Sequence, residues 1–531
     1  MRKTQLAIAV FAALATLEAA AQPEEYEDGI PSGALLYEVS AQVSGTKGDH
    51  TPLWLNANKY GLSSLDTRNG YVRAAAWHPL DADATEKKWD LGYGIDVAAA
   101  FGYTSKAIVQ QLYAEGRWLK GTLTVGSKQF DMELKNGELS SGSQTLGINA
   151  RPVPQIRIAL PDYWDVPLTK GWLGLKGHLA FGKTTDDNWQ TDFTGRNSKY
   201  TRNTLYHSKA GYIRIGNVHR FYPVSLELGL EMGTQFGGTS YNVSAEGGAY
   251  NAVDNGSGAK AFWNAFWPGG SDATENAYQN IAGNQLGSWL FRLNFDYDSW
   301  YLGLYGDHFF EDHSAMFLLD YNGYGQGEEW NVKKNRKYLM YSLKDMMLGA
   351  ELKLKYNRLI DDIVFEYIYT KYQSGPIYHD HTSNISDHIG GLDNYYNHSI
   401  FTGWQHWGQV MGNPLYLSPL YNDDGYIKVK NNRFYAFHLG VSGNPTEQLR
   451  YRMLASWQKG FGTYEEPYNN PKESFSMMAE AVYTFPDYGK TKGWSIKAAY
   501  GMDLGTIHGN NYGLQITIAK QGLLNLKRKN K

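Results

Sequence analysis

The sequence predicts an all-β fold, a transmembrane antiparallel β-barrel of about 16–18 strands with short periplasmic turns and long extracellular loops. Three observations predict this class. From about residue 69 onward, apolar and polar residues alternate in runs of roughly ten residues. The connections between these runs alternate between short and long, and aromatic residues gather where the runs end. A soluble β-sandwich would explain the alternation, but it has no physical reason to keep its long loops at one end.

Two runs show the alternation most clearly. In "VSLELGLEMG" (224–233) every even-numbered residue is apolar, and Glu227 and Glu231 lie on the other face. In "WLFRLNFDYD" (289–298) every odd-numbered residue is apolar, opposite Arg292. Such runs exceed the modal soluble strand of about 5–6 residues and approach the roughly 9–11 residues that cross a bilayer. Charges on the polar face fit a wet or plugged lumen.

The connections set the expected orientation. The short ones are 218–222, 298–300, 357–360, 444–447 and 486–491. The long ones are 237–286, 313–344 and 374–431, with shorter members at 461–472 and 504–511. Outer-membrane barrels have short periplasmic turns and longer extracellular loops. We therefore expect the C-terminus on the periplasmic side and the long loops outside the cell.

The strand count depends on the first 170 residues. Clear runs number about 16, and about 18 if 35–44 and part of 142–160 join the wall. The segment "RPVPQIRIALPDYWDVP" (151–167) contains four prolines, which favours a plug or an irregular segment.

The two ends predict export. Arg2 and Lys3 precede the apolar run 6–17, and Ala19 to Ala21 supply small residues for cleavage, so 1–21 is a predicted signal peptide. The chain has no Cys to carry a lipid and no later apolar stretch long enough for a transmembrane helix. The expected organisation is 22–68 as a periplasmic or plug segment that could supply a first strand, 69–520 as the barrel, and 521–531 as a basic tail. The expected location is the outer membrane of a Gram-negative bacterium, as an integral multi-pass barrel.

The stretch "DNYYNHSIFTGWQHWGQVMGNPL" (393–415) places many aromatic rings in a predicted loop. Sugar rings stack on Trp and Tyr at roughly 0.5–1.5 kcal/mol per contact, amides and imidazoles bond hydroxyls, and many weak contacts together bind a polymer. The alternative is that these rings form the packed core of a long loop. The candidate glycan-binding residues are Asp393, Asn394, Tyr395, Tyr396, His398, Trp404, His406, Trp407, Trp263, Trp267 and Trp330.

A group of histidines and aspartates precedes and enters this stretch. It comprises His379, Asp380, His381, Asp387 and His388, followed by His398 and His406. Such a density could ligate a divalent metal or supply a general base, but the spacing matches no compact zinc pattern. The chain also has no P-loop, no Rossmann fingerprint and no nucleophile elbow. We therefore expect no metal, no cofactor and no enzymatic activity.

Charged residues on the polar faces of the runs have two interpretations. They could form a selectivity ring in a channel, or they could pair with a plug. The residues concerned are Glu227, Glu231, Arg292, Asp296 and Asp298.

Four blocks together resemble the Wzi-like capsule assembly family of outer-membrane proteins. They are "GDHTPLWLNANKYGL" (48–62), "NARPVPQIRIALPDYWDVPLTKGWLGLKG" (149–177), "GPIYHDH" (375–381) and the stretch 393–415. The resemblance implies an 18-stranded barrel with a lectin-like role in holding capsular or related surface polysaccharide. Members of this family are not known as enzymes.

The predicted function is therefore a non-catalytic, lectin-like outer-membrane protein that anchors or organises surface polysaccharide. The alternative is a porin-type diffusion channel with the same wall and an open lumen. The expected partners are the polysaccharide, outer-membrane lipid and lipopolysaccharide, and the polysaccharide export machinery. With 50 basic and 53 acidic residues, the chain has no broad positive field for nucleic acid. We expect a monomer.

Overall fold

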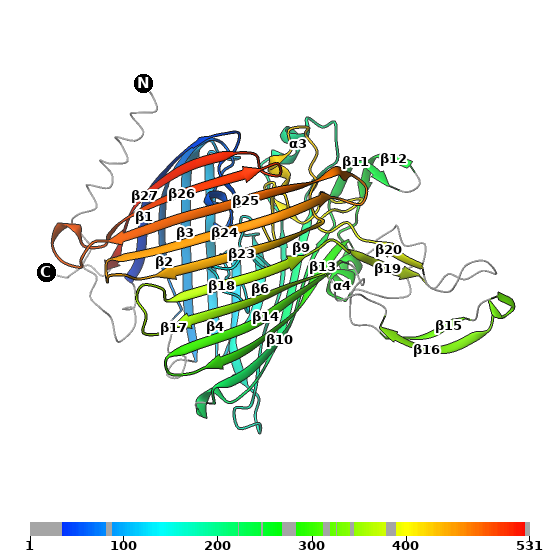
Figure 1. Ribbon diagram of the computed structural model, residues 1–531, viewed down its shortest axis with the longest axis horizontal. Coiled ribbons are helices and arrows are strands. Elements are labelled where there is room, and N and C mark those ends of the chain that lie inside the picture. The colour runs from blue at the N-terminus through cyan, green and yellow to red at the C-terminus, as the bar shows by residue number, and fades with distance from the viewer. Residues whose placement is uncertain are drawn as a thin grey trace.

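The protein is one closed β-barrel whose long connections gather at one end (Figure 1). The computed structural model describes residues 34–80, 88–220, 222–245, 248–267, 283–311, 319–324, 327–339, 345–378 and 389–525. Within these ranges, no helix has both the length and the apolar character needed to cross a membrane.

Eighteen antiparallel strands form the wall. They are β1 (Ala34–Lys47), β2 (Arg68–His78), β3 (Trp89–Phe101), β4 (Ala107–Trp118), β5 (Gly121–Ser127), β6 (Gln155–Asp165), β7 (Leu173–Lys183), β9 (Leu205–Ile215), β10 (Val224–Phe236), β13 (Asn284–Asp296), β14 (Trp300–Glu311), β17 (Met346–Leu354), β18 (Asp362–Tyr369), β23 (Phe434–Gly443), β24 (Leu449–Gly462), β25 (Pro467–Thr484), β26 (Trp494–Gly505) and β27 (Asn511–Asn525). Each pairs with the next in this order. β27 pairs with β1 from Ala34↔Asn525 to Lys47↔Tyr512, which closes the barrel.

Successive connections lie at opposite ends of the wall. One end, which we call the turn end, carries short links such as 119–120, 297–299 and 444–448. The other, which we call the loop end, carries the long connections, including 128–154 and 370–433. The longest links all lie at the loop end, as predicted, although this end also carries the short links 102–106, 463–466 and 506–510. Because outer-membrane barrels keep their longer loops outside the cell, we assign the loop end to the extracellular side.

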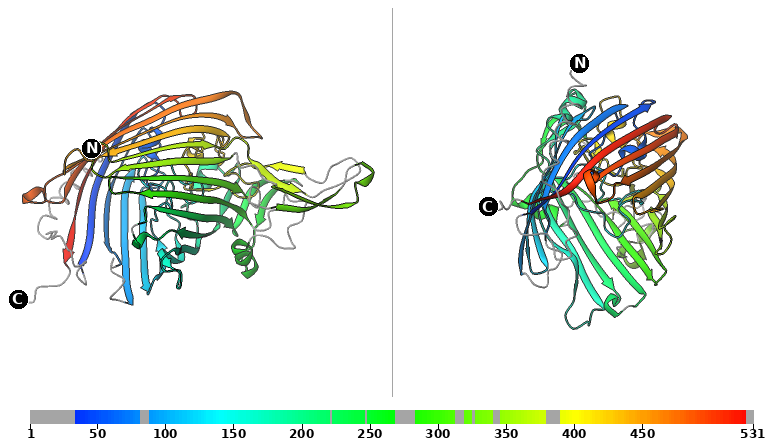
Figure 2. Two further views of the ribbon diagram at one scale, coloured as in Figure 1. Left: turned by 60° about the horizontal axis from the view of Figure 1, so that its bottom comes forward. Right: turned by 90° about the vertical axis from the view of Figure 1, so that its left-hand side faces the viewer.

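Smaller elements lie in the loop-end connections, and several project beyond the wall (Figures 1 and 2). The strands are β8 (Tyr200–Arg202), β11 (Thr239–Ala245), β12 (Gly248–Asp254), β15 (Leu319–Tyr324), β16 (Lys333–Leu339), β19 (Ser374–Tyr378), β20 (Ile389–Leu392), β21 (Gln405–His406) and β22 (Gln409–Val410). The helices are α2 (Leu53–Asn56), α3 (Trp189–Thr194), α4 (Ala259–Phe266) and the 3₁₀ turns η3 (Gly327–Glu329) and η4 (Pro419–Tyr421), while η2 (Val218–Arg220) and η5 (Gly489–Thr491) lie at the turn end.

The pairing register assigns the two faces of the wall. Leu228 lies opposite Phe291, and both are exposed on the outside. The adjacent pair Glu227 and Arg292 points inward, and Arg292 is buried. An apolar outer face and a polar inner face are what a barrel in lipid requires, because the hydrocarbon offers no partner to a charge.

Aromatic pairs mark the turn end of the outer face. Trp89 stacks on Trp118 with ring centroids 5.8 Å apart, and Trp172 contacts Tyr222 at 5.0 Å. Rings with an apolar body and a polar tip favour the boundary between lipid and water. The pairs therefore place one edge of the membrane at this end.

Three boundaries differ from those predicted from sequence. The proline-rich segment 151–167 contributes the wall strand β6, whose pairing register shifts between Leu160 and Trp164. Pro161 lies in that shift, where the ladder needs no N–H from it, so the proline is accommodated. The wall also begins at Ala34 and ends at Asn525, outside the expected range 69–520, because β1 and β27 pair with each other along their full lengths. Strands β24 and β25 extend into the expected loop 461–472 and shorten it to residues 463–466.

We expect Leu228→Arg to destabilise the barrel by about 2–4 kcal/mol, because a charge near the middle of the lipid-facing belt has no partner. The measurement is urea-dependent folding into phospholipid vesicles. Tyr426→Arg, at an exposed loop position, is the matched control and should change stability little. Equal losses for both variants would contradict this assignment of the outer face.

Candidate functional site

Three loop-end segments pack into the barrel interior. Residues 48–67, 128–154 and 393–433, here called the plug, contribute buried apolar side chains to one core together with inward-facing wall residues. Trp54 and Leu139 represent the first two segments in this core, and Tyr395 represents the third. The aromatic stretch singled out in the sequence therefore lies inside the barrel.

Tyr395, Tyr396 and Trp404 are almost completely buried. Trp404 Nε1 donates to the Thr145 carbonyl at 2.9 Å, and its ring stacks on Tyr206 of β9 at 5.8 Å. Burial of this kind matches the packing role considered for these rings, with their polar atoms satisfied inside the plug.

The two tyrosines are bonded to several segments at once. The Tyr395 hydroxyl donates to Asp345 at 3.1 Å, and the Tyr396 hydroxyl donates to the Gln144 carbonyl. The Tyr396 backbone N–H donates to Glu311 at 2.5 Å. Burial holds the pKa of both phenols well above the usual value, so both remain protonated donors.

His406 uses both ring nitrogens within the protein. Nδ1 donates to the Arg151 carbonyl at 2.8 Å, and Nε2 accepts from the Thr185 backbone N–H at 3.1 Å. His398 Nδ1 accepts from the backbone N–H groups of Ile400 and Phe401 at 3.0 and 3.2 Å. Burial lowers the pKa of His406 to about 4 and that of His398 to about 3, so both imidazoles are neutral at physiological pH.

The remaining predicted residues of this stretch are partly buried or lie near the plug surface. Asn394 Oδ1 accepts from Asn397 at 2.8 Å and from Asn432 at 2.6 Å, and Asp393 is buried beside it. Trp407 is half-buried, with the Arg151 guanidinium 4.2 Å from its ring centroid. This cation–π pair leaves part of the indole facing outward.

The three other tryptophans lie apart from the plug. Trp263 belongs to α4, and Trp267 follows it. Trp330 follows η3, in the connection between β15 and β16, and its backbone N–H donates to Gly327. The structure therefore does not bring the eleven predicted residues into one site.

The inner wall holds the plug through carboxylates that the sequence analysis did not single out. Glu366 of β18 accepts from the Ser140 hydroxyl at 2.6 Å and the Ser141 N–H at 2.9 Å. Asp307 of β14 accepts from the Gln144 N–H at 3.1 Å and pairs with Lys135 at 2.8 Å. In the sequence, each of these residues appears only as a carboxylate on the polar face of an alternating run. That pattern does not distinguish it from other charged residues of the wall.

Three further wall residues also contact the plug. Asp503 of β26 accepts from the Leu53 N–H at 3.2 Å. Arg292 donates to the plug carbonyl of Leu134 at 3.0 Å and pairs with Glu351. Glu231 contacts the Ser143 hydroxyl at 3.4 Å. For Arg292 and Glu231, pairing with a plug is therefore the correct alternative.

The prediction that all five charges face the lumen is wrong for Asp298, which lies in the turn after β13. Asp296 ends β13 at the turn end, is exposed and pairs with Lys355 at 2.6 Å. Asp298 is exposed in the following turn. Asp296 still pairs with Tyr301 in the wall, on the same side of β13 as Arg292, whereas Asp298 lies beyond the last paired residue.

The structure describes only part of the histidine and aspartate group for which a metal site was considered. His379, Asp380, His381, Asp387 and His388 lie outside the described residues. Within the described ranges, no group of three or more His, Cys, Asp or Glu residues could hold a metal ion.

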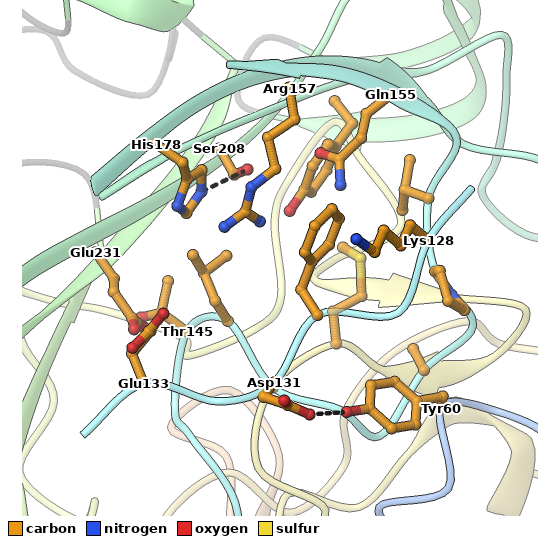
Figure 3. A pocket seen from close by; sticks show the side chains of 18 of the residues that line it. Tyr60, Lys128, Asp131, Glu133, Thr145, Gln155, Arg157, His178, Ser208 and Glu231 are labelled. Carbon is orange, nitrogen blue, oxygen red and sulfur yellow. Dashed lines mark hydrogen bonds between the residues drawn. The ribbon is translucent and has the colours of Figure 1, made fainter. Parts of the chain in front are cut away.

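A cavity of about 100 Å³ lies between the plug and the wall strands β6, β7, β9 and β10 (Figure 3). Arg157, stacked 3.9 Å over the Phe130 ring, and His178 line one side, while Glu133 and Glu231 line another. The polar lining and this volume suit several ordered waters. The cavity is a small polar-lined space beside the plug.

The fold and the segments packed inside it together define an outer-membrane β-barrel whose lumen holds loop segments. No family model and no curated protein matches the chain. Among solved structures, it is similar to Wzi, described as an outer-membrane protein involved in group 1 capsule assembly in Escherichia coli and as a carbohydrate-binding β-barrel. The identity is 12% and the TM-score 0.53, with 91% of this chain and 83% of that chain covered.

Two barrels from Pseudomonas aeruginosa also match. OprD is 9% identical with a TM-score of 0.42, covering 95% of this chain and 98% of its own. OccK2, solved in complex with glucuronate, is 8% identical with a TM-score of 0.43, covering 93% and 98%. At such identities the similarity to Wzi shows the fold alone, and the two weaker matches carry no functional argument.

We expect Trp404→Ala to loosen the plug while the barrel still folds. Removing a buried indole costs about 3–5 kcal/mol, whereas the half-buried Trp407 should cost much less when replaced by Ala. The measurement is the rate of protease cleavage within 393–433, with heat-modifiable migration as the test of the barrel. Equal cleavage rates for the two variants would show that Trp404 does not fix the plug.

The plug should also weaken in acid. His406 and His398 have a lower pKa in the folded plug than the unfolded value of about 6.5, so the unfolded segment binds more protons below that pH. Plug stability should be complete above pH 6.5 and fall by up to roughly 1.4 kcal/mol per pH unit for each histidine as the pH drops toward 4. Hydrogen exchange in 393–433 measures this, and His406→Gln should flatten the pH dependence. An unchanged slope in that variant would contradict the role of His406.

Proposed function

We propose that the protein anchors or organises capsular or related surface polysaccharide at the outer membrane, without catalysing a reaction. The observation that carries this proposal is the use of the longest aromatic-rich connection to fill the lumen at the loop end. A porin-type channel needs a continuous aqueous path, whereas a filled lumen gives a rigid surface facing outward. The resemblance in sequence to Wzi-like proteins and the similarity of fold to Wzi point the same way.

Within the proposed site, buried and exposed residues have different tasks. Tyr395, Tyr396, Trp404 and His406 would position the surface from below, because their side chains are enclosed. Trp407, held from below by the stacked Arg151, would meet the glycan, with the amide and backbone groups around Asn394 and His398 bonding hydroxyls. Trp330 would add a separate stacking contact on the β15–β16 projection. Export machinery could deliver the polymer to this surface.

The test compares polysaccharide retention in a strain lacking the protein with the same strain carrying wild type or variants. Wild type should restore cell-bound polysaccharide, and the deletion strain should shed it into the medium. Losing the Trp407 and Trp330 contacts, at about 0.5–1.5 kcal/mol each, should weaken binding by roughly 5- to 150-fold and increase shedding.

Trp407→Ala/Trp330→Ala is the test variant, and Tyr488→Ala, an exposed aromatic at the turn end, is its matched control. Both should reach the outer membrane in equal amounts. Equal retention in the deletion and wild-type strains would overturn the proposed function. Equal retention in the two variants alone would reject only these contact residues.

A further inference from the structure

Helix α4 packs against the barrel wall through aromatic rings. The ring of Phe262 lies 5.3 Å from that of Phe181 on β7 and 5.1 Å from that of Phe236 on β10. Phe266 contacts His207 on β9 at 6.3 Å. Three neighbouring strands therefore share one docking face for this helix.

That docking face is the outside of the barrel. His207 and Ile213 lie on the same side of β9, since their positions differ by an even number along a regular ladder. Ile213 is 42% exposed as part of the outer apolar belt. The neighbouring Tyr206 points the other way and stacks on Trp404 inside the plug. Helix α4 thus covers the outer wall and not the lumen.

Polar contacts hold the helix there. Lys209 faces outward from β9 and donates to the carbonyl of Phe266, the last residue of α4. Gln285 of β13 donates to the Asn264 carbonyl at 3.3 Å. A cation at a helix C-terminus is stabilised by the helix dipole, and here the contact also supplies a partner for a lysine on the outer wall.

The helix lies at the membrane boundary opposite the turn-end aromatic pairs. From Val224 to Met232, β10 climbs roughly 20 Å along the barrel axis, at about 3.4 Å per residue and a tilt of about 40°. The apolar belt of such barrels is about 25 Å tall. Met232 lies opposite Lys209, at the level of the α4 C-terminus, and so close to the other edge of the belt.

We propose that α4 is an interfacial membrane anchor whose Trp263 and Trp267 enter the lipid leaflet at the loop end. These two side chains are 62% and 63% exposed and lie four residues apart, while Ala265 is fully buried against the wall. Helix α4 lies on the same outer face of the wall as the exposed side chains of Leu228 and Ile213. Tryptophan prefers the boundary between headgroups and acyl chains, and an amphipathic helix buries its apolar side at that depth. The ligand of these rings is therefore lipid and not the glycan.

The chain contains no Cys, so one introduced Cys gives a unique labelling site. Trp263→Cys and Trp267→Cys, each carrying a bimane label, are compared in phosphatidylcholine vesicles with acyl-brominated lipid or with iodide as quencher. Leu228→Cys is the lipid control, and the exposed loop position Tyr426→Cys is the water control. We expect both α4 labels to be quenched by brominated lipid and shielded at least severalfold from iodide relative to Tyr426→Cys. Iodide quenching equal to that control, with no lipid quenching, would overturn the proposal.

A second measurement avoids the label. Wild type and Trp263→Ser/Trp267→Ser are each moved from normal to brominated vesicles, and the loss of tryptophan fluorescence is compared. Wild type should lose more emission, because two lipid-contacting indoles are present. The same fractional loss in both proteins would contradict the anchor. Neither result depends on whether the loop end binds polysaccharide.

Discussion

Hydrogen bonds from the plug to buried carboxylates of the inner wall are the constraint on which the rest of the structure depends. Glu366, Asp307 and Asp503 each accept a backbone N–H from a plug segment. A buried carboxylate without partners is strongly destabilising, and so is a buried N–H without an acceptor. The wall carboxylates and the plug N–H groups therefore satisfy each other. Each hydrogen bond to a charged group contributes about 1.5–3 kcal/mol to stability. At these positions, the polar inner face of the strands attaches the plug to the wall.

Close approach of plug and wall follows from this attachment. Gly233 of β10 lies under the Trp404 ring, and a Cβ there would collide with the indole. The aromatic stretch is committed to the interior, so only its upper residues, such as Trp407, can face outward. The outer wall faces lipid. Its aromatic rings, at the turn end and on α4, lie at the boundary between lipid and water. One composition rich in Trp and Tyr therefore serves three environments: a dry core, a lipid boundary and a wet surface.

Local periodicity was enough to predict the barrel, because alternation and loop length are properties of single strands and single links. The runs 224–233 and 289–298 are wall strands with the expected faces. That β6 belongs to the wall was not predictable, because a bulge accommodates Pro161 and only the pairing with β7 shows this. The positions of the candidate site residues were harder to predict than the strands. Whether Trp404 faces a sugar or a core, and whether Trp263 lies at the mouth or outside, depends on contacts between residues far apart in the chain. Asp307 and Glu366 gave no local signal that distinguished them from other lumen charges.

Conductance in planar lipid bilayers tests the attachment of the plug most directly. Wild-type protein should insert without stable current steps, because the plug fills the lumen. Glu366→Leu/Asp307→Leu, which removes two of the attachment points, should give intermittent openings while the barrel remains heat-modifiable. Stable, frequent steps from the wild-type protein would contradict a lumen closed by wall-bound segments. They would favour a diffusion channel in its place.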